Sequence, residues 1–174
     1  MKISILGYMG SGKSTIGKDL AFQLGLDFID LDAFIEAKES KSIIELFSSL
    51  GEIKFRKIEH EALSEILNSK KNIILAVGGG TPVYYNNMEI INNESTSIYL
   101  RLTPNELSNR LQKEKEKRPL ISHIKNEDLP EFVAKHLFER RNFYEQADIV
   151  IDVRDKSTTA LVQEIIPHLP LHGK

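Results

Sequence analysis

The sequence contains no cysteine. Disulfide bonds, zinc sites built on thiolates and catalysis by a thiol nucleophile are therefore excluded. It also has no apolar run close to the roughly 20 residues that a helix needs to cross a bilayer. Its first residues, which lead directly into a glycine-rich segment, lack the longer apolar core of a signal peptide. We therefore expect a cytoplasmic protein that does not bind membranes.

Neither sign of charge is in excess. The chain has 23 Lys and Arg against 25 Asp and Glu, a formal net charge of −2. This balance gives no bulk electrostatic attraction to nucleic acid or to anionic membranes. With 41% hydrophobic and 28% charged residues, the composition is that of a folded globular protein, and the length of 174 residues is that of one domain.

Five short segments rich in Ile, Leu and Val alternate with helical patterns. Most of them are continuously apolar, which is typical of strands buried on both faces of a sheet. The predicted strands are 2–6, 28–30, 72–77, 97–102 and 149–153, and the predicted helices are 13–24, 43–49, 52–68, 104–114, 128–146 and 158–166. This order predicts an α/β fold in which helices flank a five-stranded parallel sheet. Two regions depart from it: 31–69 is predicted to be an insertion with extra helices, and 112–125, which begins with a Lys/Glu run, a mobile surface segment or lid.

Glycine is scarce, but six of the ten glycines lie in two clusters. The first cluster belongs to Gly7-Tyr8-Met9-Gly10-Ser11-Gly12-Lys13-Ser14-Thr15, which matches the pattern G-x-x-x-x-G-K-[ST] between a strand and a helix. The backbone N–H groups of such a loop converge on a phosphate, and the helix N-terminus adds partial positive charge. Lys13 is expected to contact the β- and γ-phosphates and Ser14 to bind Mg²⁺. The sequence therefore predicts a nucleoside triphosphate site.

Two carboxylates follow the second predicted strand, in Phe28-Ile29-Asp30-Leu31-Asp32. Ligands of parallel sheets bind at the carboxyl ends of strands, so both side chains are placed to face the phosphate loop. One would support Mg²⁺, directly or through water, and the other would orient or deprotonate an acceptor hydroxyl. The alternative is that Asp32 is only the N-cap of a following helix. The motif alone favours neither.

Two arginines fall on apolar helix faces. At about 100° per residue, Glu59 lies inside the apolar stripe of helix 52–68 and Arg56 at its edge, three residues away and within contact range. In the helix near the C-terminus, Arg140 falls in the apolar stripe whereas Arg141 points about 100° away. A guanidinium on such a face must be paired or must line a polar cavity. The alternatives are an internal salt bridge and the binding of an anionic substrate, whose carboxylate a guanidinium matches bidentately.

The second glycine cluster, Gly78-Gly79-Gly80, follows the third predicted strand. It is either a tight turn into a helix that Thr81 would cap, with Pro82 at the first helical position, or a place where the backbone approaches a ligand closely. The three glycines alone favour the tight turn, and their position at the carboxyl end of a strand adds weight to a ligand.

Two further arginines are candidates for the nucleotide site. Arg118 ends the charged stretch and could be a cation that a closing lid brings to the reacting phosphate, or merely a solvated loop charge. Arg110, eight residues earlier, could stack on a flat aromatic surface such as adenine.

The ordered set of motifs resembles that of the shikimate kinases, small P-loop kinases related in fold to nucleoside monophosphate kinases. The resemblance covers Ile3 to about Val153 and rests on the phosphate loop, the Asp30 and Asp32 segment, and five further features: Phe47; Gly51-Glu52-x-x-Phe55-Arg56-x-x-Glu59; the three glycines; Arg118-Pro119-Leu120; and Arg140 four residues before Tyr144. The family has a three-layer P-loop fold and transfers the γ-phosphoryl group of ATP to the 3-hydroxyl of shikimate, with Mg²⁺.

The resemblance implies a role for each candidate residue. Lys13, Asp32 and Arg118 would be catalytic, and Ser14 and Asp30 would hold Mg²⁺, the latter through water. ATP would contact Gly10, Ser11, Gly12, Lys13, Ser14, Thr15, Arg110 and Arg118. Shikimate would contact Asp32, Phe47, Phe55, Arg56, Glu59, Gly78, Gly79, Gly80 and Arg140. The resemblance also implies a cytoplasmic monomer of aromatic amino-acid biosynthesis with ATP and shikimate as its only partners.

Two other functions compete with this interpretation. A gluconate-kinase-like enzyme would also use arginines for a carboxylate-bearing acceptor, although Asp32 combined with three glycines favours shikimate. A P-loop nucleotide-binding switch without an acceptor is the alternative from a different class. The pair Arg56 and Glu59 argues against the switch, because a switch has no use for an ion pair on an apolar helix stripe that faces a cleft.

Overall fold

A computed structural model describes residues 1–69, 72–115 and 119–170. Its five strands form one sheet in the order β2-β3-β1-β4-β5, and all four strand pairs are parallel. The strands are β1 (Lys2–Leu6), β2 (Asp27–Asp30), β3 (Ile73–Ala76), β4 (Thr96–Arg101) and β5 (Ile149–Asp152). The predicted parallel sheet of five strands is confirmed, with boundaries that differ by one residue or none at each end.

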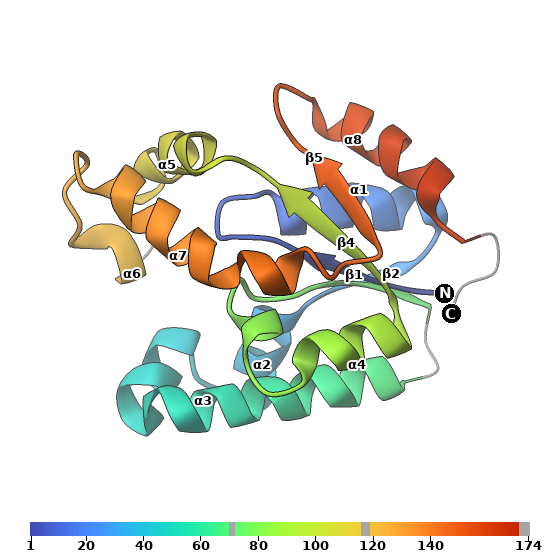
Figure 1. Cartoon of the computed structure of the whole chain (residues 1–174). Coiled ribbons are helices and arrows are strands. Elements are labelled where there is room, and N and C mark those ends of the chain that lie inside the picture. The colour runs from blue at the N-terminus through green and yellow to red at the C-terminus, as the bar shows by residue number, and fades with distance from the viewer. Residues whose placement is uncertain (70–71, 116–118, 171–174) are drawn as a thin grey trace.

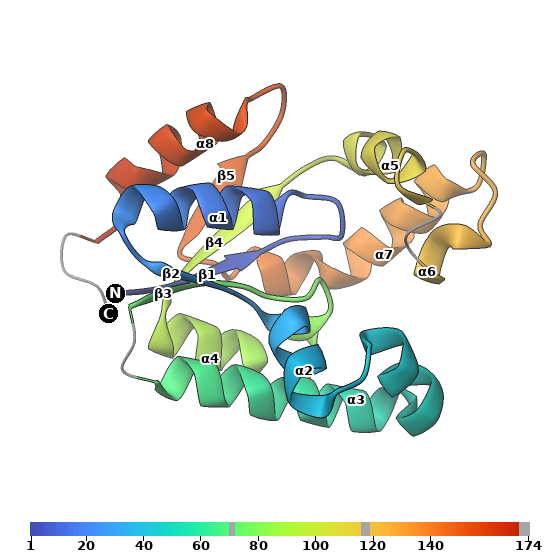
Figure 2. The ribbon, with the colours of Figure 1, turned by 180° about the vertical axis from the view of Figure 1, so that it is seen from behind.

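Helices cover both faces of this sheet (Figures 1 and 2). The helices are α1 (Lys13–Leu24), α2 (Leu31–Glu39), α3 (Ile43–Asn68), α4 (Asn87–Glu94), α5 (Pro104–Gln112), α6 (Pro119–Ser122), α7 (Leu129–Tyr144) and α8 (Thr158–Ile165), with short 3₁₀ turns η1 (Thr81–Val83) and η3 (Ile166–His168). α1 and α8 lie together on one face, and α2, α3 and α4 on the other. Among the described residues, none of these helices has the length and apolarity needed to cross a membrane.

The alternation of side chains along the strands explains the two cores. Ile3 and Ile5 of β1 pack into the cluster shared with α1, α5, α7 and α8, whereas Leu6 packs into the cluster shared with α2, α3 and α4. In β3, Ile74 belongs to the first cluster and Leu75 to the second. Burial on both faces is why these strands are continuously apolar.

The region 31–69 holds α2 and α3, which pack on each other below the sheet in Figure 1. The predicted helices 43–49 and 52–68 are one element with a kink at Gly51, whose φ of 76° is not helical. The spacing of apolar residues in the sequence did not reveal the bounds of α2. It also did not reveal α4, which is short and rich in Asn. Both owe their stability to packing against α3.

One predicted helix start is wrong. Thr81 and Pro82 open only the three-residue turn η1, and the Thr81 side chain caps no backbone group. Its hydroxyl instead donates to Glu59 Oε1 over 2.6 Å. A buried partner carboxylate competes successfully for this hydroxyl, because a charge-assisted hydrogen bond is stronger than a neutral cap.

Candidate active site

A cavity of about 300 Å³ opens where β1, β2 and β3 end. Its lining comes from the phosphate loop, the end of β2 and the glycine segment after β3. The lining residues are Met9, Gly10, Gly12, Lys13, Ser14, Thr15, Asp30, Asp32, Val77, Gly78, Gly79 and Glu114. The cavity thus brings together predicted nucleotide, metal and acceptor residues at the carboxyl edge of the sheet, where parallel sheets bind ligands.

The phosphate loop has the backbone that its glycines predict. Gly10 and Gly12 have φ angles of 79° and 96°, a region that side chains other than glycine rarely adopt. α1 begins directly after it at Lys13, whose Nζ donates to the carbonyl oxygens of Gly7 and Tyr8 over 2.9 and 3.1 Å. These bonds hold the ammonium group against the cavity. Ser11 is buried and does not line the cavity, so its hydroxyl is not available there.

The two carboxylate oxygens of Asp30 accept hydrogen bonds from different parts of the chain. Oδ2 accepts from the Ser14 hydroxyl over 2.7 Å, which ties the end of β2 to the start of α1. Oδ1 accepts from the backbone N–H groups of Asp32 and Ala33 over 3.1 and 3.3 Å and so caps α2. The alternative that made Asp32 the helix cap is therefore wrong: the cap lies two residues earlier and leaves the Asp32 carboxylate free for the cavity.

Asp32 is an unusually weak acid for an aspartate. Its pKa is raised from 3.8 to about 6, first by burial and then by the negative charges of Asp30 and Glu59, which outweigh the opposing Lys13 ammonium. A carboxylate with this pKa is a better proton acceptor than an ordinary aspartate and is still ionised at pH 7. Its position in the cavity lining and its pKa together make it the strongest candidate for a group that interacts with an acceptor hydroxyl.

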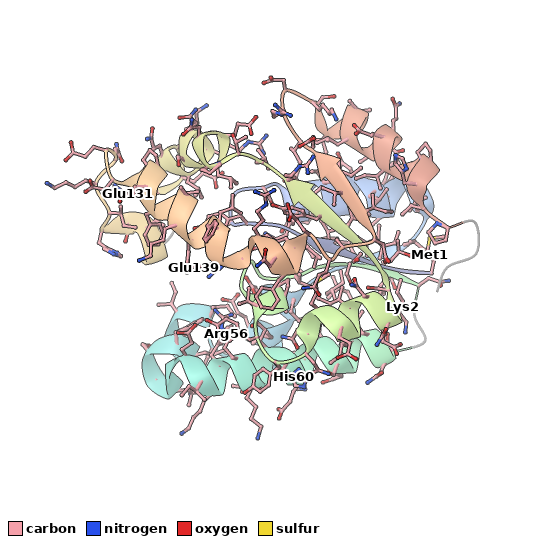
Figure 3. The ribbon with its side chains drawn as sticks, viewed as in Figure 1. Met1, Lys2, Arg56, His60, Glu131 and Glu139 are labelled. Atoms are coloured by element: carbon pink, nitrogen blue, oxygen red, sulfur yellow. The ribbon has the colours of Figure 1, made fainter. Side chains whose placement is uncertain are left out.

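Arg56 is held by acidic side chains and by aromatic rings. Its Nη1 donates to Glu59 over 2.8 Å, and the Glu59 side chain is only 1% exposed. Its guanidinium carbon lies 4.3 Å from the centre of the Tyr84 ring and between 5 and 6 Å from those of Phe47 and Phe55. Figure 3 shows it on the side of α3 that faces α7. The predicted internal ion pair is confirmed, and the rings hold the same guanidinium in one place.

The three glycines lie close to four charged side chains, two acids and two arginines. A Cβ at Gly78 would lie 3.0 Å from Glu59 Oε1 and 3.2 Å from Asp32 Oδ1, and one at Gly80 only 2.7 Å from Arg56 Nη2. A Cβ at Gly79 would lie 3.7 Å from Arg140 Nη1. The segment is therefore a turn and also the centre around which the two arginines and the two acids are arranged. Side chains at Gly78 or Gly80 would displace the groups next to them.

Arg140 points inward and Arg141 outward, as the helical wheel predicts. Arg140 lies 5.7 Å from the centre of the Tyr8 ring, and its Nη2 is 3.1 Å from His136 Nε2. The Arg141 side chain is 63% exposed and pairs with Glu145 on the helix surface. The buried Tyr144 donates to the carbonyl oxygen of Gly79, which fastens the end of α7 to the glycine segment.

Of the two remaining nucleotide candidates, the structure describes only Arg110. Arg110 is exposed at the end of α5, and its Nη1 reaches the Ser11 carbonyl oxygen over 3.5 Å. Arg118 lies outside the described residues. Sequence reasoning missed Glu114, which lines the cavity, because it belongs to a run of Lys and Glu typical of a solvated surface. It also missed His136, for which no motif gave a signal, although both ring nitrogens have polar side-chain partners.

Comparison with known proteins gives one consistent answer. The family model described as shikimate kinase matches residues 9–170. The shikimate kinase of Flavobacterium johnsoniae is 44% identical over 95% of this chain and 96% of its own. The crystal structure of shikimate kinase from Bacteroides thetaiotaomicron superposes with a TM-score of 0.90 at 34% identity, covering 96% of this chain and 97% of that one.

Two further solved structures separate shikimate kinases from another kinase of similar fold. Shikimate kinase from Acinetobacter baumannii, solved in complex with shikimate, has a TM-score of 0.86 at 31% identity and covers 95% of this chain and 90% of its own. A gluconokinase from Sinorhizobium meliloti reaches only a TM-score of 0.61 at 19% identity, a likeness of fold alone. The arrangement of the cavity, the family model and these relatives agree, and the chain belongs to the shikimate kinase family.

Proposed function

We propose that the protein transfers the γ-phosphoryl group of ATP to the 3-hydroxyl of shikimate, giving ADP and shikimate 3-phosphate. The observation that carries this proposal is the arrangement around Gly78, Gly79 and Gly80. It gathers the Asp32 carboxylate and the Arg56 and Arg140 guanidiniums next to the phosphate loop. An acceptor with a carboxylate at one end and a hydroxyl at the other fits this arrangement, because guanidiniums bind carboxylates and Asp32 can accept a hydroxyl proton.

The donor side of the reaction falls to the phosphate loop. Gly10, Gly12 and Thr15 would surround the phosphates, and Lys13 would neutralise charge that develops on the transferred group. Ser11 would contribute through its backbone, since its hydroxyl is buried away from the cavity. Arg110, beside the loop, would contact the nucleotide. In-line transfer then depends mainly on positioning and charge neutralisation.

The Ser14 and Asp30 pair fits a magnesium site. A hydroxyl and a carboxylate oxygen are hard ligands of the kind Mg²⁺ prefers, and they lie 2.7 Å apart at the cavity wall. No cluster of three or more acidic, His or Cys side chains that could hold a metal occurs among the described residues. The Ser14 and Asp30 oxygens would leave most of the ion's coordination to phosphates and water. When bound, Mg²⁺ would neutralise charge on the β- and γ-phosphates.

The acceptor side uses the insertion between β2 and β3. Arg56 and Arg140 would hold the shikimate carboxylate, Phe47 and Phe55 would pack beside it, and the glycines would line its ring. Glu59 would act through Arg56, which it holds. Arg118, outside the described residues, is proposed as the cation of a lid at 112–125. The enzyme is also proposed to act as a monomer in the cytoplasm.

The clamp, meaning Arg56 and Arg140 around the shikimate carboxylate, is tested by Arg140→Ala. Arg141→Ala is the matched control. The first variant should raise KM for shikimate about 100-fold while KM for ATP stays nearly constant, because a charge-assisted contact worth about 3 kcal/mol is lost. The control should change neither value, since Arg141 points to solvent. Steady-state kinetics with coupled ADP release measures both constants. An unchanged KM for shikimate in Arg140→Ala would remove Arg140 from the clamp.

The glycine segment is tested by Gly80→Ala. The backbone of Gly80 has a φ of −90°, which alanine adopts easily, so the only new feature is a methyl group against the Arg56 guanidinium. We expect KM for shikimate to rise about tenfold through displacement of Arg56. In an Arg56→Ala background the same substitution should have little further effect. Additive effects of the two substitutions would show that Gly80 does not act through Arg56.

A further inference from the structure

The two arginines proposed to hold the acceptor carboxylate are supported in different ways. Arg56 is paired with the buried carboxylate of Glu59 and also contacts Glu52 at 3.4 Å, so acidic neighbours offset much of its charge. Arg140 forms no ion pair with an acidic side chain in the described part of the chain. Its polar contacts there are with His136 and Tyr144, two neutral side chains.

The contact between Arg140 and His136 fixes the tautomer of the imidazole. A guanidinium can only donate, so His136 Nε2 must accept from Arg140 Nη2 over 3.1 Å. A neutral imidazole then carries its proton on Nδ1, which lies 3.0 Å from the Tyr8 hydroxyl and donates to it. His136 and Arg140 are four residues apart on α7, on the same helix face. One ring therefore joins Arg140 to the second residue of the phosphate loop.

The surroundings of His136 keep it in this neutral state. Burial and the Arg140 cation lower its pKa below the usual 6.5, and the weaker effects of the Glu139 and Glu52 carboxylates oppose the shift. Ring contacts fix its plane as well: the Tyr8 ring meets it edge-on with centres 5.9 Å apart, and the Phe132 ring lies at 5.2 Å. The Tyr8 hydroxyl is itself a weak acid, since burial raises its pKa to about 12, so it stays a neutral partner.

We propose that His136 is a positioning residue for the acceptor carboxylate: its neutral ring orients Arg140 without offsetting the guanidinium charge, and anchors it to Tyr8 of the phosphate loop. A carboxylate in place of this ring would compete with the substrate for Arg140, whereas an imidazole accepts one hydrogen bond and leaves the net charge in place. This inference rests on the proposed role of Arg140 in binding shikimate.

Two substitutions separate the two ends of the ring. In His136→Gln the amide oxygen can replace Nε2 as acceptor for Arg140, whereas in His136→Asn the amide nitrogen replaces Nδ1 as donor to Tyr8 and the Arg140 contact is lost. We expect KM for shikimate to rise about tenfold in His136→Asn and in His136→Leu, the loss of one charge-assisted hydrogen bond. In His136→Gln it should stay within about twofold of the starting protein. KM for ATP should change little in all three.

Equal KM values for shikimate in the Gln, Asn and Leu variants would overturn the proposal, as would a loss expressed in kcat alone. Arg140→Ala separates this failure from failure of the proposed function: if it raises KM and the His136 variants do not, only the positioning role is wrong. If Arg140→Ala itself has no effect, the clamp assignment fails.

A second measurement does not depend on activity. The pKa of His136 can be followed by NMR in the full-length protein, with its signal assigned by comparison with His136→Gln. We expect a value below 6.5 that rises in Arg140→Ala, because the neighbouring cation is gone and Nε2 is free to take a proton. A pKa that does not move in Arg140→Ala would show that the two side chains are not in contact, and would also overturn the proposal.

Discussion

Replacing Lys13 by methionine is expected to lower kcat by about 1000-fold or more and to leave the fold intact. Lys13 is the cation that the phosphate loop holds at the wall of the cavity, where its Nζ is anchored by the carbonyl oxygens of Gly7 and Tyr8. A preorganised charge at a transferring phosphoryl group contributes most in the transition state, so its loss lowers kcat more than it raises KM for ATP.

Lys18→Met is the matched control. Lys18 lies on the same helix, is exposed and contacts the Phe28 ring instead of the cavity. Single-turnover kinetics should show normal rates for the control, and thermal unfolding should show that both variants are folded. A Lys13→Met protein that keeps more than about a tenth of kcat would contradict the assignment of Lys13 to the transferred phosphate.

Asp32→Asn is expected to lower kcat by about 100- to 10,000-fold, the usual contribution of a positioned proton acceptor. An amide keeps the size of the side chain and can still contact a hydroxyl, but it cannot take a proton at neutral pH. For the unchanged protein, the pKa of about 6 predicts that kcat/KM falls tenfold for each pH unit below about 6. This acid limb should vanish from the residual activity of Asp32→Asn. Its persistence there would assign the limb to another group.

The same substitution should stabilise the protein. The pKa of Asp32 is higher in the folded state than in the unfolded chain, so the folded state binds the proton more tightly, and the free energy of unfolding falls as pH rises from about 3.8 to about 6. Asp32→Asn should therefore raise the free energy of unfolding at pH 8 by about 1–3 kcal/mol and have little effect at pH 4.

Urea unfolding at the two pH values measures this difference, with Asp19→Asn on the exposed face of α1 as the control. Equal effects at pH 8 and pH 4 would show that burial of the ionised Asp32 does not destabilise the folded state. A gain in stability combined with a loss of turnover is expected when burial of an ionised group destabilises the folded protein and the same group is needed for the reaction.

Features that depend on neighbours in the sequence were predictable. The phosphate loop is one contiguous segment whose glycines, lysine and hydroxyl are recognisable together, and the buried strands are apolar because both their faces are covered. The inward direction of Arg140 and the pairing of Arg56 with Glu59 followed from helical geometry, which is also local.

Features that depend on contacts between distant parts of the chain could not be predicted from the sequence. Whether Asp30 or Asp32 caps α2 is decided by Ser14, sixteen residues away, which holds Asp30 in place. Thr81 does not form the predicted helix cap, because its hydroxyl donates to Glu59, which lies within hydrogen-bond range in the folded protein. α2 and α4 form because α3 offers them an apolar surface, and their own periodicity is too short to reveal it.

The sequence by itself determined the class of chemistry, since phosphate binding, a parallel sheet and the candidate arginines are all encoded in short segments. Only the tertiary structure decided which residue has which structural or functional role. It assigned Asp30 to the cap and left Asp32 to the cavity, and it gave Arg56 an acidic partner and Arg140 neutral ones. It also explained the three glycines by the two acids and two arginines around them. The physical reason is that charge, desolvation and steric exclusion act between atoms that are close in space, whereas sequence patterns report only what is close along the chain.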